Sequence, residues 1–220
     1  MKIFSIFQSI NGEVNREHQG SITTFIRFAG CNLRCNWCDT ARAQDPCNGK
    51  RMKFADVLNE VHTKNVTITG GEPLLQEPEV HALSLTLAHK KHLVSIETNG
   101  SLKIPYGWPV SWVVDWKTPS SGMKHCMKLE NFIPLTKRDF VKFVIADDKD
   151  FCAAIETIRV LKLDGCKAKF AMSPLGGGTK APGIDGEYLY HWMLKEPICL
   201  ENSVILSLQI HRVLGLREDS

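Results

Sequence analysis

The sequence has no apolar run that approaches the ~20 residues a membrane-spanning helix requires. We also expect no cleavable signal segment, because polar Gln8 and Ser9 interrupt the short apolar stretch before them. Low-complexity tracts, internal repeats and long charged linkers are absent as well. We therefore expect a single domain over residues 1–220 that lies in the cytoplasm and has no membrane partner.

A large excess of charge of one sign is missing too. The formal net charge is +3 and the pI is about 8.4, which falls short of the strongly basic character of nucleic-acid-binding domains. We expect no nucleic-acid partner, and an anionic small substrate suits this charge. The composition, 43% hydrophobic and 23% charged residues, is typical of a globular protein that buries about 70–75% of its unfolded surface.

Cysteines arranged as a disulfide framework are also lacking. Five of the eight are scattered singly, which favours a reducing compartment; they are Cys47, Cys126, Cys152, Cys166 and Cys199. The other three, Cys31, Cys35 and Cys38, follow the spacing CxxxCxxC. Thiolates suit zinc or iron–sulfur iron, and a fully ligated site of either kind needs four protein ligands. Three thiolates indicate a 4Fe–4S cluster with one open iron, or a zinc site completed by a distant side chain.

Short β-branched runs alternate with helical patterns along the chain. Helices are predicted near residues 54–61, after Pro78 and from about 149 to 163, and strands at 23–28, 66–69, 93–96, 111–114, 140–145, 169–172 and 204–208. This alternation predicts right-handed βαβ units and a mostly parallel sheet. Seven strands are too few for a complete eight-stranded barrel. The expected fold class is therefore α/β with a partial, open TIM-like barrel.

Glycine, proline or polar residues directly follow the predicted strands. They occupy positions 30–31, 70–73, 97–100, 115–119, 173–178 and 209–211. Because the carboxyl ends of the strands form the active face of parallel α/β barrels, these loops should converge near the three cysteines.

The CxxxCxxC spacing, with Trp37 just before the last cysteine, resembles the signature of radical S-adenosylmethionine (SAM) enzymes. The resemblance implies a radical SAM barrel, a 4Fe–4S cluster on the three cysteines and SAM as cofactor. The SAM-binding residues that it implies are Trp37, Gly70, Gly71, Glu72, Glu97, Lys117 and Ser173. Two simpler interpretations stay open: residues 70–73 as a plain turn, and Glu97 as a carboxylate that accepts local backbone hydrogen bonds.

Further segments resemble 7-carboxy-7-deazaguanine synthases over nearly the whole chain. These segments are residues 3–13, 25–35, 37–40, 69–73, 97–100, 117–122 and 206–212. Asn11 and Val14 depart from the Gln and Gly of the family's opening motif, and Asp115-Trp116-Lys117 departs from its Ser-Pro-Lys. The resemblance implies a lyase that converts 6-carboxy-5,6,7,8-tetrahydropterin to 7-carboxy-7-deazaguanine, a queuosine precursor, with hydrogen abstraction at C6 and loss of ammonia. No catalytic residue is expected beyond the cluster and the cofactor.

The same resemblance implies the remaining site residues. Thr40 would bind Mg²⁺, and the substrate would be bound by Ile10, Asn11, Gly12, Glu13, Arg27, Thr69, Gln209 and His211. From the residues alone, Arg27 also suits a surface ion pair, Thr40 a helix N-cap and His211 a structural histidine. The expected partners are the pterin, an electron donor such as flavodoxin or ferredoxin, and a second copy of the chain.

Two other functions are compatible with the cysteine loop. A glycyl-radical-enzyme activase shares the CxxxCxxC loop but must admit a protein segment, and the N-terminal and final segments argue against it. A non-catalytic iron–sulfur or zinc protein would have a protein residue as its fourth ligand, and Gly70-Gly71-Glu72-Pro73 would then have no special task.

Overall fold

The computed structural model describes residues 1–175 and 183–216, so Gly176–Gly178 of the predicted loop lie outside the described residues. In the described part, one sheet has the strand order β3-β1-β2-β4-β5-β6-β7-β8-β9. The strands are β1 (Lys2–Ile10), β2 (Ile22–Phe28), β3 (Lys50–Arg51), β4 (Asn65–Gly70), β5 (Leu93–Thr98), β6 (Ser111–Trp116), β7 (Phe140–Ile145), β8 (Lys169–Pro174) and β9 (Ile205–Leu206).

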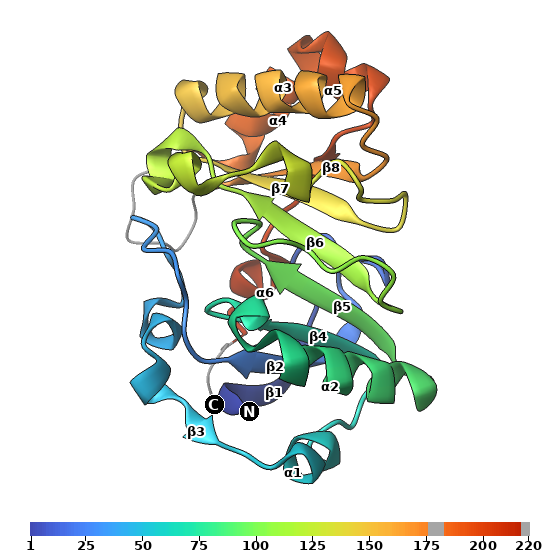
Figure 1. The fold of residues 1–220 in the computed structure, drawn as a ribbon. Helices are drawn as coiled ribbons and strands as arrows, with labels where there is room; N and C mark the ends of the chain where they lie inside the picture. The colour runs from blue at the N-terminus through green and yellow to red at the C-terminus, as the bar shows by residue number, and fades with distance from the viewer. Residues whose placement is uncertain (176–182, 217–220) are drawn as a thin grey trace.

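All neighbours from β2 to β9 are parallel, and only β1 pairs in the antiparallel sense, with β2 and β3. In the described chain β3 and β9 lie at the two ends of the curved sheet, which does not close (Figure 1). This arrangement confirms the expected open, mostly parallel α/β sheet. No helix in the described part is long and apolar enough to cross a membrane.

Helices and short 3₁₀ turns connect the strands. The α-helices are α1 (Phe54–Asn59), α2 (Glu77–His89), α3 (Asp148–Leu163), α4 (Gly186–Lys195), α5 (Pro197–Glu201) and α6 (Ile210–Val213). The 3₁₀ turns are η1 (Ala41–Gln44), η2 (Pro46–Asn48), η3 (Pro73–Gln76), η4 (Pro119–Ser121), η5 (Lys124–Cys126) and η6 (Leu129–Asn131). Local chemistry defines where α3 begins: the side chain of Asp147 accepts from the N–H of Asp150 (2.9 Å), an N-cap.

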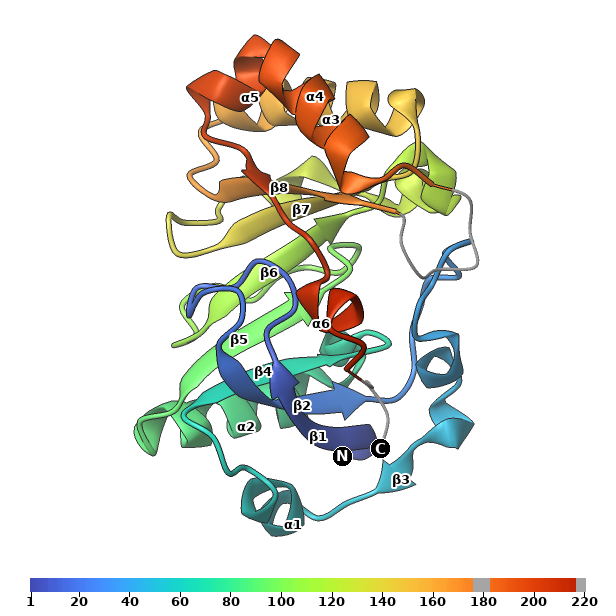
Figure 2. The ribbon, with the colours of Figure 1, turned by 180° about the vertical axis from the view of Figure 1, so that it is seen from behind.

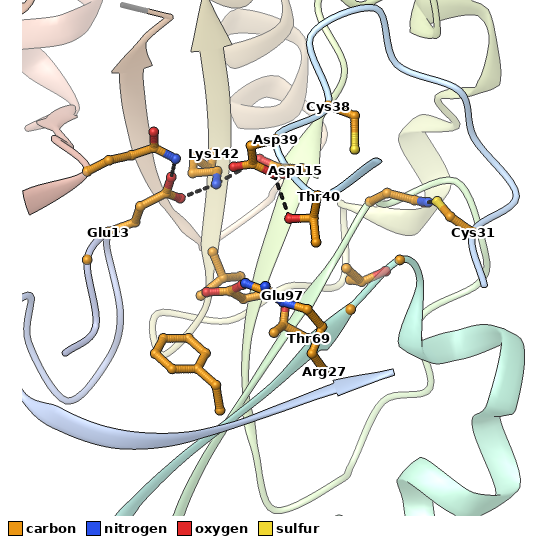
Figure 3. Close-up of a pocket in the computed structure, with 18 of the residues that line it drawn as sticks. Glu13, Arg27, Cys31, Cys38, Asp39, Thr40, Thr69, Glu97, Asp115 and Lys142 are labelled. Atoms are coloured by element: carbon orange, nitrogen blue, oxygen red, sulfur yellow. Dashed lines mark hydrogen bonds and ion pairs between the residues drawn. The ribbon is translucent and has the colours of Figure 1, made fainter. Parts of the chain in front are cut away.

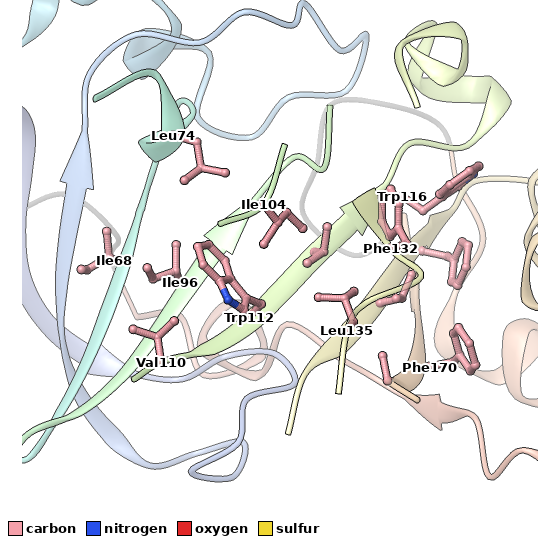
Figure 4. Packing of buried hydrophobic residues seen from close by; sticks show 14 of the residues in the cluster. Ile68, Leu74, Ile96, Ile104, Val110, Trp112, Trp116, Phe132, Leu135 and Phe170 are labelled. Atoms are coloured by element: carbon pink, nitrogen blue, oxygen red, sulfur yellow. The ribbon is translucent and has the colours of Figure 1, made fainter. Parts of the chain in front are cut away.

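The two faces of the parallel strands differ because side chains alternate along a strand. One set packs against α2 and α3 and forms the main core, part of which is shown in Figure 4; it includes Ile68, Ile96, Trp112, Val114, Phe143 and Phe170, with Leu83, Leu87, Ile158 and Leu161 from the helices. The alternate set includes polar and charged residues such as Thr69, Glu97, Asp115 and Lys142. The sheet therefore buries an apolar outer face and presents a polar inner face.

Several elements differ from the sequence-based expectation. The edge strands β1 and β3, the 3₁₀ turns between β6 and β7, and the helices α4, α5 and α6 were not predicted. The last strand ends at Leu206 instead of residue 208. The N–H of Ser207 still donates to the carbonyl of Met172 on β8 (2.8 Å), and its Oγ accepts from the N–H of Val14 (3.1 Å). The following residues form α6 on the inner side of the sheet (Figure 2).

Candidate functional site

A cavity lies at the carboxyl ends of the parallel strands, on the inner face of the sheet (Figure 3). Fifteen of the predicted site residues line it: Ile10, Gly12, Glu13, Arg27, Cys31, Cys35, Cys38, Thr40, Thr69, Gly70, Gly71, Glu97, Lys117, Gln209 and His211. Trp37 and Ser173 line an adjoining cavity that shares Cys35, Cys38 and Lys117 with the first. The structure thus brings together residues from both ends of the sequence and from most of its strands.

The cysteine loop is fixed by backbone hydrogen bonds at its base. The N–H of Gly30 donates to the carbonyl of Ala43 (2.8 Å), and the N–H of Cys31 donates to that of Gln44 (3.1 Å). These bonds join the end of β2 to η1, so the loop between them leaves the sheet and returns beside it. All three thiols are directed to the same cavity.

Burial favours the neutral form of two of these thiols, Cys31 and Cys35. It raises the pKa of Cys35 to about 11, although the ammonium of Lys117 acts in the opposite direction. Burial also raises the pKa of Cys31, whose sulfur accepts from the N–H of Leu33 (3.4 Å) and from Nδ2 of Asn99 (3.7 Å). A group that binds here must supply positive charge to stabilise thiolates, as iron does.

The three thiols suit a cluster better than a single zinc ion. Within residues 1–175 and 183–216, no group of three or more His, Cys, Asp or Glu side chains is arranged to hold one metal ion. In an iron–sulfur cluster each cysteine binds its own iron atom, so the sulfurs need not converge on one point. The donor set, all thiols on one short loop, fits a 4Fe–4S cluster.

The adjoining cavity has features that fit a polar ligand beside the cysteines. Among the described residues, the buried Oγ of Ser173 has no hydrogen-bond partner, which is rare for a buried hydroxyl. The ammonium of Lys117 lies 5.5 Å from the centre of the Trp37 ring and 3.0 Å from Oδ2 of Asp115. Trp37 is itself held by a hydrogen bond from Nε1 to the Oγ of Ser120 (3.0 Å). A fixed cation and an unsatisfied hydroxyl thus face one space.

Glycines at the end of β4 are required by close backbone packing. A Cβ on Gly70 would lie 2.2 Å from the carbonyl oxygen of Phe28, and one on Gly71 would lie 2.2 Å from that of Gly30. The N–H of Gly71 also donates to the carbonyl of Phe28 (2.9 Å). Any larger residue at either position would push the end of β4 away from the base of the cysteine loop.

Glu72 does not lie where the resemblance implied. It is fully buried outside the cavity lining, where Oε1 accepts from the N–H of Leu74 (2.9 Å) and the hydroxyl of Thr98 (2.8 Å), and Oε2 accepts from the N–H of Asn99 (2.7 Å). Burial raises its pKa, while these hydrogen bonds act in the opposite direction. Its carboxyl group therefore joins η3 to the end of β5 instead of facing a ligand.

Charged side chains cross the inner face of the sheet. Lys142 on β7 contacts Oε2 of Glu13 and lies 3.4 Å from Oδ1 of Asp115 (Figure 3). Burial alone would lower its pKa, but Asp115, Glu13 and Glu97 outweigh burial and raise it well above the ordinary value. Conversely, the ammonium groups of Lys117 and Lys142 outweigh burial and lower the pKa of Asp115. These lysines and Asp115 are therefore charged at neutral pH.

Glu97 titrates near neutrality. Burial raises its pKa to about 7; Lys142 and the hydroxyl of Thr69, which donates to Oε2 (2.8 Å), act to lower it, and the neighbouring carboxylates act to raise it. Because it lines the cavity, this carboxyl group is able to donate or accept a hydrogen bond there, depending on its protonation.

An aromatic stack supports Arg27. The rings of Phe7 and Phe25 face each other with centroids 5.1 Å apart, and the guanidinium of Arg27 lies 5.1 Å from the centroid of Phe7. All three side chains line the cavity, and only 8% of Arg27 is exposed. Arg27 is therefore a buried cation with a fixed orientation, which is inconsistent with a surface ion pair.

The C-terminal segment covers the N-terminal side of the cavity. The N–H of Ile210 donates to the carbonyl of Gly12 (3.0 Å), and Nε2 of Gln209 donates to Oε1 of Glu13 (2.6 Å). Arg212 forms an ion pair with Asp39, just after the cysteine loop (3.2 Å). Segments far apart in sequence thus form one wall.

Comparison with known proteins identifies the family. The profile of the Radical SAM superfamily matches residues 25–104. The 7-carboxy-7-deazaguanine synthase of Clostridium acetobutylicum is 37% identical over 225 residues, 97% of this chain and 95% of that protein. That of Koribacter versatilis is 33% identical over 232 residues (99% and 98%), and that of Methanospirillum hungatei is 35% identical over 224 residues (98% and 86%).

The chain belongs to the 7-carboxy-7-deazaguanine synthase family. As such it is an enzyme with a radical SAM domain, and the family implies a 4Fe–4S cluster, SAM and a small-molecule substrate. These relatives favour neither an activase nor a non-catalytic metal protein.

Solved structures share the fold. QueE from Escherichia coli superposes with a TM-score of 0.71 at 21% identity, covering 94% of this chain and 92% of that chain. A radical SAM methyltransferase from Sphaerobacter thermophilus gives a TM-score of 0.57 at 13% identity and covers 84% and 66%. The open radical SAM barrel expected from the cysteine motif is thus confirmed at the level of fold.

The two departures from the family's opening motif are both buried. Asn11 lies outside the cavity lining, contrary to expectation, because its amide bonds to Ser21 (2.7 Å) and accepts from the hydroxyl of Thr67 (2.8 Å). Val14 packs in a small apolar cluster with Val113 and Phe140. Val14 therefore anchors the β1–β2 loop inside the barrel by apolar contacts that the family's glycine would not make.

Thr40 lies at the cavity beside the cysteine loop. It occupies the residue before η1, but among the described residues its hydroxyl forms no cap and donates instead to Oδ1 of Asp39 (2.9 Å). The N-cap interpretation of Thr40 is therefore wrong, and its oxygen faces the cavity next to a carboxylate.

Sequence reasoning missed several lining residues. The most important are Lys142, Phe7 and Phe25, whereas Asp115 lay in a loop expected near the cysteines but was given no role. A signal existed for Lys142, since a single lysine interrupts the apolar strand Phe140–Ile145. Phe7 carried no such signal, because its partner Phe25 is known only once β1 and β2 are paired.

Proposed function

We propose that this chain converts 6-carboxy-5,6,7,8-tetrahydropterin to 7-carboxy-7-deazaguanine with loss of ammonia, as a queuosine-pathway lyase. One observation carries the proposal: a single cavity joins the three thiols of the CxxxCxxC loop to Arg27 and Glu13. The pterin presents one carboxylate and several ring donors, which a cation and a carboxylate complement.

The cofactor side lies next to the cysteines. SAM would be held by the ammonium of Lys117, the hydroxyl of Ser173, the carboxyl of Glu97 and the backbone of Gly70 and Gly71, with Trp37 beside Lys117. Together with a reduced cluster, SAM supplies the one-electron chemistry that removes the hydrogen from C6 of the substrate. Glu72 supports this side indirectly by holding the end of β5.

The substrate side lies toward the N- and C-terminal segments. Arg27, fixed on the Phe7 ring, binds the pterin carboxylate, and Glu13 accepts hydrogen bonds from ring N–H groups. Further contacts come from Ile10, Gly12, Thr69, Gln209 and His211. With this wall formed by α6, the reacting carbon is kept from water, which protects a radical reaction from side products.

Other features of the proposal rest on the family resemblance. Thr40 would provide a hydroxyl oxygen to Mg²⁺, a hard cation that prefers oxygen ligands and keeps several waters. We also propose a cytoplasmic homodimer that receives electrons from a flavodoxin or ferredoxin.

The assignment is tested by anaerobic reconstitution. Wild-type protein should bind about four irons and, with reductant, cleave SAM; with substrate deuterated at C6, the released 5′-deoxyadenosine should gain deuterium. Cys35→Ala should lose cluster and cleavage, while Cys152→Ala, an exposed thiol on α3, should keep both. A single bound zinc with no SAM cleavage would overturn the proposal.

A further inference from the structure

Lys142 lines both the main cavity and the adjoining cavity. It lies in the middle of β7, is only 9% exposed, and was not among the residues that the sequence suggested. Its ammonium contacts Glu13, which belongs to the β1–β2 loop, and lies 3.4 Å from Asp115 near the end of β6. Figure 3 shows the ammonium directed between these two carboxylates.

Each partner of Lys142 has a second contact that leads away from it. Oε1 of Glu13 accepts from Gln209 (2.6 Å), on the proposed substrate side. Oδ2 of Asp115 lies 3.0 Å from Nζ of Lys117, on the proposed cofactor side. A continuous polar chain therefore runs from Gln209 to Lys117, with Lys142 as its central member.

We propose that Lys142 couples the two subsites, so that occupancy of the cofactor side strengthens binding of the pterin. The inference rests on the proposed function for the identity of the two ligands. It adds a positioning residue whose role is to transmit occupancy between subsites rather than to touch the reacting atoms.

The direction of the coupling follows from the charges. When the carboxylate of SAM pairs with Lys117, it competes with Asp115 for that ammonium. Asp115 then pairs more closely with Lys142, and this pairing weakens the contact between Lys142 and Glu13. A less tightly paired Glu13 accepts more readily from the donors of a pterin ring. By linkage, the pterin must strengthen SAM binding by the same factor.

Burial makes this competition effective. Lys117 and Lys142 are 7% and 9% exposed, so water cannot solvate an ammonium that loses its carboxylate partner. The carboxylates near Lys142 keep it charged, as the raised pKa indicates. A change in the pairing of Lys117 therefore alters the pairing of Glu13 at the other end of this series of polar contacts.

The test is equilibrium binding to the reconstituted holoenzyme without reductant, so that neither ligand is consumed. The dissociation constant of 6-carboxytetrahydropterin is measured with and without saturating SAM. For wild type we expect SAM to tighten pterin binding about fivefold or more. In Lys142→Met, SAM should change the dissociation constant of the pterin by less than about twofold, even where both ligands still bind.

Two further variants separate coupling from a structural effect. Asp115→Asn removes one link while leaving Lys142, and should also lose coupling. Lys169→Met changes an exposed lysine on the neighbouring strand β8, over the ring of Phe140 (5.3 Å), and should retain it. If Lys142→Met fails to fold, Glu13→Gln combined with Lys142→Met removes the buried pair together, and it should likewise show no coupling.

The outcomes are decisive in either direction. Undiminished coupling in Lys142→Met or Asp115→Asn, or no coupling in wild type, would overturn the inference. A wild-type enzyme that turns over but shows uncoupled binding defeats this inference alone, whereas absence of turnover defeats the proposed function.

Discussion

The ring of His211 occupies the space that a side chain at Gly12 would fill. A Cβ built on Gly12 would lie 1.7 Å from Nδ1 of His211, so the C-terminal helix α6 reaches the N-terminal loop only because residue 12 is glycine. The contact closes one wall of the cavity. It gives a physical reason for a glycine in the proposed pterin-binding segment, where no positive φ requires one.

Gly12→Ala should therefore displace His211 and open this wall. We expect a stability loss of about 1–3 kcal/mol, as for overpacked sites, and a substrate KM raised about tenfold, which corresponds to about 1.4 kcal/mol of binding. Adding His211→Ala should restore the thermal stability, since the clash is gone, but not the KM. A Gly12→Ala enzyme with wild-type KM would contradict the role of this contact.

Thr40 offers a test of the proposed magnesium site. Thr40→Val removes the oxygen while keeping the shape, and should raise the Mg²⁺ concentration for half-maximal activity on the order of tenfold or more. Thr40→Ser keeps the oxygen and serves as the control, so its Mg²⁺ dependence should resemble that of wild type. Equal Mg²⁺ curves for the two variants would show that the Thr40 hydroxyl binds no metal.

Glu72 should be more important for stability than for ligand contact. Glu72→Ala leaves the N–H groups of Leu74 and Asn99 and the hydroxyl of Thr98 without their acceptor. A loss of about 3 kcal/mol or more in the free energy of unfolding is expected in urea titrations. Glu79→Ala, at an exposed position of α2, should change it by less than about 0.5 kcal/mol. A neutral Glu72→Ala would refute the structural role.

Glu97 should make stability depend on pH in a defined window. Its pKa is about 7 in the folded protein against an ordinary value of 4.5, so between these values the folded state holds a proton that the unfolded state has lost. Stability contributed by this group must therefore fall as pH rises from about 4.5 to 7. Relative to Glu97→Gln, wild type should lose unfolding free energy across this window. If the difference in unfolding free energy between the two proteins stays constant across this window, the pKa of Glu97 is not raised to about 7.

The sequence predicted those parts of the site that lie in short contiguous motifs. Cys31, Cys35 and Cys38 are fixed by a local spacing, and Arg27 and Thr40 lie within a few residues of them. The parallel strands were also predictable, because β-branched runs ending in glycine or polar residues mark buried strands whatever their neighbours.

What the sequence did not reveal depends on contacts between distant segments. The strand β1 is formed by pairing with β2, and Ser207, directly after β9, bonds to Val14 of the distant β1–β2 loop. Glu72 looked like a ligand in its motif, but its buried carboxylate accepts hydrogen bonds from Thr98 and Asn99 at the end of the next strand. Lys142 gains its role from Glu13 and Asp115, which lie far earlier in the chain, so no local pattern around Lys142 could reveal it.

The most direct test of the proposed function is product formation. Reconstituted enzyme is incubated anaerobically with 6-carboxytetrahydropterin, SAM, reductant and Mg²⁺, and the products are identified by mass spectrometry. We predict 7-carboxy-7-deazaguanine, formed only when cluster and SAM are both present. Cleavage of SAM without any deazaguanine would contradict the pterin assignment and leave only a radical SAM enzyme with another substrate.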